Sequence, residues 1–362
     1  MLQNILLLSS TFFRNNLFTL CHLIYTDTFY MKRKWIRWVS WILLTPIILF
    51  VILMVLLYVP PVQNLLRREV TAYASKATGM QIQVERIDLR FPLNLLVRGV
   101  EVIQQPDTLL SLESLNVRVQ AWPLIKGKVE VDEVTLSRVA VNSANLMEGM
   151  KIKGVLGRFF LQSHGVDLSN EIAIINQAEL SDTHVQLLMN DTTTTPKDTT
   201  ASAPVNWKVD LHKLKLKNVS FSMQLPADSM RMAAHIGEAF INDAQADLKN
   251  QFYELKQFLL SGSSANYDTG AAKPGEGFDA SHIAVRDIRI GLDSLLYKGR
   301  DMNAVIREFS MNERSGLSIT SLTGRAFSND SIIRIPGIKL QTPHSEIDLS
   351  AQTYWELVNI PT

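Results

Sequence analysis

The ionisable side chains of this sequence are scattered rather than gathered in the spacings that catalysis or metal binding requires. Cys21 is the single cysteine, so neither a thiolate zinc site nor a CxxC redox pair can form. His212, one of seven histidines, stands in a polar dipeptide, where a solvated or β-bulge residue is more reasonable than a ligand. Asp132, Glu133 and Glu85 occupy similar polar steps and are interpreted as surface charges.

Sequence motifs for common catalytic and cofactor sites are absent. The chain contains no GxxxxGK[ST] loop, HExxH helix, EF-hand loop or GxSxG elbow. We therefore expect no catalytic residues, no cofactor and no metal, and a protein that is not an enzyme. With 36 Lys+Arg against 35 Asp+Glu, the chain also lacks the basic excess of a nucleic-acid-binding protein.

The recurring chemistry is apolar. Two apolar residues separated by one residue are followed by two polar residues and then by another such apolar pair. Each pair alternates as in a strand with one apolar face, but the polar dipeptide shifts the phase. A β-bulge or corner at that dipeptide would restore the face and bend the sheet around it. The pattern is clearest at 82–89, 110–117, 129–141, 209–221 and 283–290.

These units predict a mainly β fold, an elongated and strongly curved antiparallel sheet with a taco-like groove, over about 81–141, 166–223 and 283–349. A pentapeptide-repeat β-helix is disfavoured, because the units never exceed three in a row and carry large residues where a tight coil needs small ones. The composition of residues 191–204 predicts a disordered loop, and that of residues 262–277 predicts a flexible loop. Residues 232–259 fit either a helix or strands, and strands are favoured.

The segment before the sheet predicts a membrane anchor at 31–61. Residues 38–59 form 22 uncharged positions that would span about 33 Å as a helix. Trp38 and Trp41 at one end and Tyr58 at the other are suited to the two membrane–water interfaces. The basic residues just before the run predict that the N-terminus lies in the cytoplasm. A cleaved signal peptide is disfavoured by the length of the run and by the absence of an A-x-A-like site. Residues 1–30 are a doubtful extension, with Met31 the alternative start.

An amphipathic helix is expected at 62–79. Its apolar positions follow helical spacing, Pro60 and Pro61 precede it, and Gly79 is placed as its C-terminal cap. This helix would lie on the outer membrane surface or cover the end of the sheet. Residues 80–362 then form the β domain.

The order of these features resembles a known family. Residues 77–93 read ATGMQIQVERIDLRFPL, and 99–102, 107–110 and 122–129 read GVEV, DTLL and WPLIKGKV. Together with the basic residues and single apolar helix before them, they resemble the N-terminal portion of AsmA-like proteins, particularly the TamB branch. The resemblance is good over residues 31–141 and looser to 350.

The resemblance implies a protein anchored in the bacterial inner membrane by a single pass, with most of the chain in the periplasm. Its groove would carry phospholipid toward the outer membrane. The candidate groove residues are Ile82, Val84, Ile87, Leu89, Val129, Val131, Val134, Leu136, Val209, Leu211, Leu214 and Leu216.

Three alternatives remain open. The same apolar residues could fill a closed sandwich core. The family also carries an assembly role, in which an exposed sheet edge would help to secrete or assemble outer-membrane β-barrels and autotransporters with a barrel partner. A membrane-tethered scaffold would need only the anchor and a binding surface.

About fifteen strands would give a groove of roughly 70 Å. TamB proteins are much longer than this chain, so we expect the chain to be either a fragment or a short relative.

Overall fold

A computed structural model provides the coordinates of this protein, and it divides the chain into two units, Met1–Val62 and Gln63–Thr362. The residues that it describes run from 41 to 357, except for 42–43, 47, 50, 53–54, 57, 92, 105–106, 121, 124–129, 144–148, 168–169, 190–205 and 271–272.

The first unit contains residues 31–61, for which the sequence predicts a membrane anchor. Its described residues between Trp41 and Leu56 are helical, and Trp41 is exposed. Trp38 and the doubtful extension at 1–30 lie outside the described residues. Within the part of the chain that the structure describes, no helix combines the length and the apolar character needed to cross a membrane.

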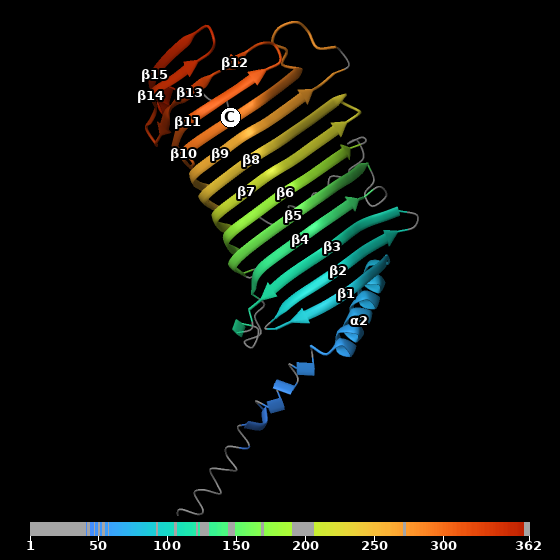
Figure 1. The fold of residues 1–362 in the computed structure, drawn as a ribbon. Helices are drawn as coiled ribbons and strands as arrows, with labels where there is room; N and C mark the ends of the chain where they lie inside the picture. The colour runs from blue at the N-terminus through green and yellow to red at the C-terminus, as the bar shows by residue number, and fades with distance from the viewer. Residues whose placement is uncertain are drawn as a thin grey trace, which may run out of the picture. The chain divides into compact units, whose positions relative to one another are not determined.

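The second unit is built around one sheet of 15 strands, shown in Figure 1. The strands are β1 Gln81–Arg90, β2 Asn94–Gln104, β3 Asp107–Val119, β4 Val131–Asn142, β5 Met150–Asp167, β6 Ile172–Met189, β7 Lys208–Leu225, β8 Met230–Asp247, β9 Phe252–Asp268, β10 His282–Lys298, β11 Asp301–Glu313, β12 Ser318–Ile319, β13 Ser321–Ser328, β14 Ile332–Gln341 and β15 Glu346–Tyr354. A 3-10 turn, Trp355–Leu357, follows.

The strands lie side by side in chain order, and only the short β12 leaves the path, pairing with β11. β1 and β15 are the two ends of the path, so the sheet is unclosed. This arrangement agrees with the predicted mainly β fold and excludes the β-helix alternative.

The prediction of an entirely antiparallel sheet is wrong at one place. β6 and β7 pair in parallel, with Ala173 opposite Val209 and Leu180 opposite Leu216. Parallel neighbours need a crossover connection instead of a tight turn. The polar stretch between Met189 and Lys208 provides that length, although the predicted disordered loop at 191–204 lies outside the described residues.

The ambiguous segment at 232–259 forms strand, as favoured, within β8 and β9. The predicted loop at 262–277 is wrong in its first part, because β9 continues to Asp268. Gly262 has a φ of +59° and lies against Gly237 of β8. It therefore serves as a bulge residue within a strand, and its Gly/Ser surroundings resemble a loop only in composition.

The helix before the sheet, α2, spans Pro60–Thr78, so it includes the two prolines that were expected just before it. Pro is well tolerated in a first helical turn, where no N–H is needed. Gly79 ends the helix with a φ of +69°, and its N–H donates to the Ser75 carbonyl at 3.0 Å. The predicted cap is confirmed.

α2 covers the free edge of β1, beside which it lies in Figure 1. The Gln63 side chain donates to the Leu89 carbonyl at 3.0 Å, and Arg67 donates to the Glu85 carbonyl at 2.7 Å. The Ser75 hydroxyl accepts from the Ile82 N–H at 3.1 Å. Side chains of the helix thus satisfy backbone groups that an edge strand would otherwise leave open to another chain.

Little of the second unit is buried. Among the described residues, only six apolar ones are buried, and no side chain falls below 2% exposure. A closed sandwich of this length would bury the inner faces of two sheets almost completely. The described strands instead form a single sheet, with the buried apolar residues Ile87, Leu109, Leu112, Ala173, Ala178 and Ala239.

Candidate functional site

Backbone irregularities occur within the strands at three of the predicted phase shifts. Arg138, Asn218 and Asp287 each have a positive φ, between 47° and 57°, and each is the second residue of a polar dipeptide. Non-glycine residues rarely adopt this conformation. The register between Val285 and Ile288 shifts around Asp287. The prediction of a backbone irregularity at the polar dipeptide is confirmed at these three places.

The apolar pairs of β7 on both sides of the dipeptide His212-Lys213 have apolar partners on β8. In β7, Leu211 pairs with Ala244, Leu214 with Ile241 and Leu216 with Ala239. His212 and Lys213, between the first two pairs, are exposed, whereas the three leucines are half-buried. Apolar residues therefore meet apolar partners on both sides of the phase shift.

Positive-φ residues of β2, β4, β6, β7, β9 and β10 line up across the sheet in what we call the bulge seam. It runs through Gly99, Arg138, Asp182, Asn218, Gly262 and Asp287. Asn218 donates to Asp182 at 2.8 Å, which joins the seam across the parallel pair. Arg138 forms an ion pair with Glu113 of β3. Local polar bonds thus hold strained backbone in place.

His212 belongs to a second polar line, beside Asp243, which has a φ of 47°. The His212 Nδ1 lies 3.1 Å from one Asp243 oxygen, and Lys256 lies 3.4 Å from the other. The hydrogen bond with His212, followed by the interactions with Lys256, lowers the pKa of Asp243. His212 is more than half exposed, so the expectation of a solvated or bulge residue is confirmed.

The central feature of the site is one uninterrupted line of cross-strand partners, which we call the long row. Each strand on the main path contributes one residue, and every contribution is apolar or glycine. In strand order from β1 to β15 the members are Leu89, Leu95, Val117, Val134, Leu161, Ala178, Leu214, Ile241, Phe258, Leu292, Ile306, Gly324, Ile338 and Leu349.

The long row has apolar neighbours. One neighbouring line of cross-strand partners begins at Ile87, which pairs with Val97. The same line includes Leu136, which pairs with Phe159, and Leu216, which pairs with Ala239. Val84 pairs with Val100 in the next line. The line through Ile87 lies two residues from the long row on regular strand, and therefore shares its face. The line through Val84 lies three residues from Ile87, across a polar step at which Gly99 of β2 has a φ of +59°. We assign it to the same face because an irregularity at this step can restore the phase. We call this surface the apolar face.

Eleven of the twelve candidate groove residues lie in β1, β4 or β7, with their cross-strand partners on the apolar face. Val129 lies outside the described residues. Ile87 is buried and the other ten are half-buried. Strands β1, β4 and β7, far apart in the sequence, are thus joined into one surface by the strands between them.

Several members of the apolar face were missed by the sequence reasoning. Leu156, Phe159 and Leu161 of β5 flank the polar step Gly157-Arg158 and carry the same spacing as the candidates, so a signal was present. Ala178 and Ala239 gave no such signal, because alanine does not mark an apolar face.

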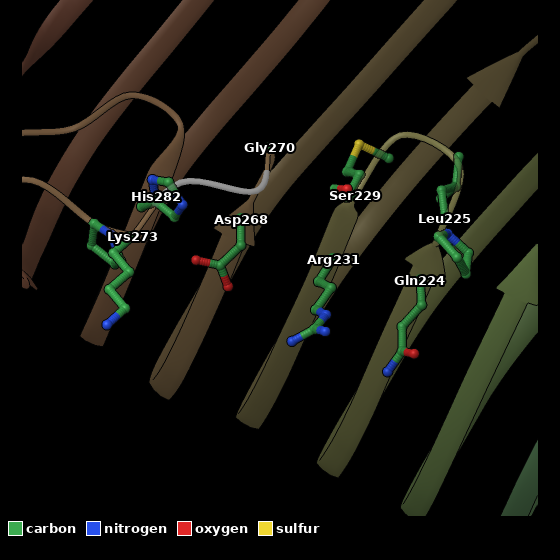
Figure 2. A pocket seen from close by; sticks show the side chains of 11 residues that line it. Gln224, Leu225, Ser229, Arg231, Asp268, Gly270, Lys273 and His282 are labelled. Carbon is green, nitrogen blue, oxygen red and sulfur yellow. The ribbon is translucent and has the colours of Figure 1, made fainter.

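The opposite face is mixed, with Phe160, Phe240 and Leu259 in the same line of cross-strand partners as Glu179 and Lys215. Lys215 pairs with Glu179 across the parallel strands, and Lys208 lies 3.3 Å from Asp247. This face also has a hollow of about 550 Å³ near the turn between β7 and β8. Figure 2 shows Gln224, Arg231 and Asp268 there, on three neighbouring strands with side chains pointing the same way. The lining of the hollow also includes Leu225, Pro226 and Met230.

Searches for similar proteins gave no relative: no protein-family model matches the chain, and no curated protein matches it.

Proposed function

We propose that this protein binds the acyl chains of phospholipids along the apolar face and passes them from the inner membrane toward the outer membrane. The long row is the observation that carries the proposal. It crosses every strand of the main path without a polar side chain, yet most of its members remain half-buried. A surface that is apolar throughout and uncovered by protein suits a ligand with long apolar chains.

The energetics favour such a ligand. A two-chain lipid in water exposes roughly thirty methylenes at about 0.8 kcal/mol each, or about 25 kcal/mol in total. A curved apolar face can cancel most of this cost by replacing water around the chains. Conduction of this kind requires no catalytic residue, in agreement with the scattered ionisable groups.

The proposed location follows from the sequence. The uncharged run at 38–59, with basic residues before it, supports a single-pass inner-membrane anchor with the sheet in the periplasm. The resemblance of residues 31–141 to the TamB branch of AsmA-like proteins supports the same placement and the same cargo.

Photo-crosslinking tests the proposal. A benzophenone amino acid would replace Leu214 on the apolar face or Lys215, its neighbour on the opposite face, in the full-length protein in cells. Val131 provides a second apolar position, on β4. We expect phospholipid adducts at Leu214 and Val131, and at least about tenfold fewer at Lys215, because successive side chains face opposite sides of the sheet. Equal lipid labelling at Leu214 and Lys215 would refute the proposal.

A second candidate function is the assembly or secretion of outer-membrane β-barrel proteins and autotransporters with a barrel partner. β15 supports this candidate, because all its residues except Thr353 are exposed and it ends the path of described strands. Such an edge can accept an extended peptide by strand addition. A crosslinker at Ser350 would then capture nascent barrel peptides. The absence of both lipid and peptide adducts would favour a membrane-tethered scaffold.

A further inference from the structure

α2 presents its polar side to the sheet and leaves its large apolar residues exposed. The residues that bond β1, namely Gln63, Arg67 and Ser75, spread over about 120° of the helix circumference, with Gln63 at the border of the apolar stripe. Leu66, Val70 and Tyr73 lie on another side, within about 60° of one another at about 100° per residue. Helices on globular proteins usually turn such a stripe toward the core.

The exposure of this stripe is large. Leu66, Val70 and Tyr73 are 42%, 47% and 76% exposed, and Leu65 nearby is 57% exposed. None of the buried apolar residues of the described chain belongs to α2. The sheet therefore holds the helix by hydrogen bonds to its edge, and another surface is available to the stripe.

The sequence favours a lipid bilayer as that surface. α2 begins at Pro60, directly after the uncharged run that ends at Val59, so the predicted anchor tethers it at the membrane interface. Tyr73 is of the type that concentrates at this depth. Arg68 and Lys76, both exposed, add positive charge that attracts anionic lipids.

We infer that α2 lies in the outer interface of the anchoring bilayer, with Leu66, Val70 and Tyr73 in the acyl region, while its polar side stays bonded to β1. This inference rests on the proposed function. Docking of α2 would hold the β1 end of the apolar face at the membrane surface, where acyl chains can leave the bilayer. α2 would then have two roles: it covers the free edge of β1, and it holds the β1 end of the apolar face at the membrane.

Spin-label depth measurements test this inference on the full chain. Cys21 would be replaced by serine, and a nitroxide attached to Tyr73→Cys or, as the matched control, to Arg68→Cys. Arg68 lies roughly 140° from Tyr73 around the helix. In vesicles of phosphatidylethanolamine and phosphatidylglycerol, we expect the label at 73 to collide with oxygen and to be shielded from a water-soluble nickel chelate. The label at 68 should show the reverse.

A charged variant sharpens the test. Leu66→Glu combined with Val70→Glu should raise the nickel collision rate of the label at 73 severalfold, because two carboxylates would hold the stripe in water. Equal exposure of the two labels to nickel in the uncharged protein would overturn the inference.

The proposed function and this inference can fail separately. Lipid adducts at Leu214 with a water-exposed label at 73 would retain conduction and overturn docking. A membrane-buried label at 73 without lipid adducts at Leu214 would support docking and refute conduction.

Discussion

Glu313 is a charged residue at the rim of the apolar face, where it is the cross-strand partner of Val285. It is buried, and its carboxylate accepts hydrogen bonds from the Ser315 N–H at 2.6 Å and the Ala284 N–H at 3.2 Å. The Ser315 hydroxyl and backbone N–H, together with the other donors, lower its pKa from 4.5 to about 2. The ionised form is therefore favoured in the folded protein.

This shift gives a pH-dependent contribution to stability. A carboxyl group whose pKa is lowered by folding stabilises the fold fully above its unfolded pKa, and the contribution is lost as the pH falls through the folded pKa. Glu313→Gln should lower the free energy of unfolding near neutral pH, and the difference from the parent should disappear between pH 4.5 and about 2. Urea unfolding across this range measures it. A difference that does not change with pH would contradict the account.

Substitution of Gly237 tests how closely β8 and β9 approach each other. A Cβ at this position would lie 2.6 Å from the Gly262 carbonyl oxygen and 2.9 Å from that of Ser261, both backbone atoms. Gly237→Ala should therefore destabilise the protein by about 1–3 kcal/mol. Gly337→Ala is the control, since a Cβ there meets nothing within 4 Å. Equal urea midpoints for the two variants would show that the approach is looser than described.

At the scale of the element, the polar dipeptides allowed the bulges to be predicted. An alternation of period two that shifts phase after Lys217-Asn218 cannot keep one apolar face on straight strand, so the backbone must deviate there. The structure does so with a φ of 54° at Asn218. The same reasoning applies to the polar step in β5, which carries the same spacing but was not among the predicted units.

Other elements could not be predicted from the pattern. The parallel pairing of β6 and β7 was missed, because side-chain alternation is the same in parallel and antiparallel strands. The start of the loop near Gly262 was misjudged for a different reason: a glycine that supplies positive φ within a strand has the same composition as one in a loop.

The edge cover provided by α2 leads to a prediction about association. Replacing Ser75 and Gln63 together by alanine removes the side chains that bond Ile82 and Leu89 of β1. The exposed edge should then pair with other chains, and sedimentation should reveal oligomers that the parent lacks. Lys76→Ala, on an exposed side of the helix, is the control. A double variant as monodisperse as this control would show that the bonds to β1 do not protect the edge.

At the scale of the whole sheet, the surface arises from pairing that no single strand specifies. The candidates in β1, β4 and β7 could be identified from local spacing, but their connection into one row depends on register across every intervening strand. Whether the face is open could not be read from alternation, because packed cores and open grooves use the same apolar residues. The single sheet and the small number of buried residues favour the open arrangement.

A crosslinking scan along β7 tests the central claim most directly. Single benzophenone substitutions from Val209 to Val219 would be compared for phospholipid adducts in cells. We predict strong adducts at 209, 211, 214, 216 and 219, with weak ones between, so that the two-residue period shifts phase once at 212–213 and again at 217–218. Lipid labelling that is uniform along β7, or absent from all these positions, would contradict the account.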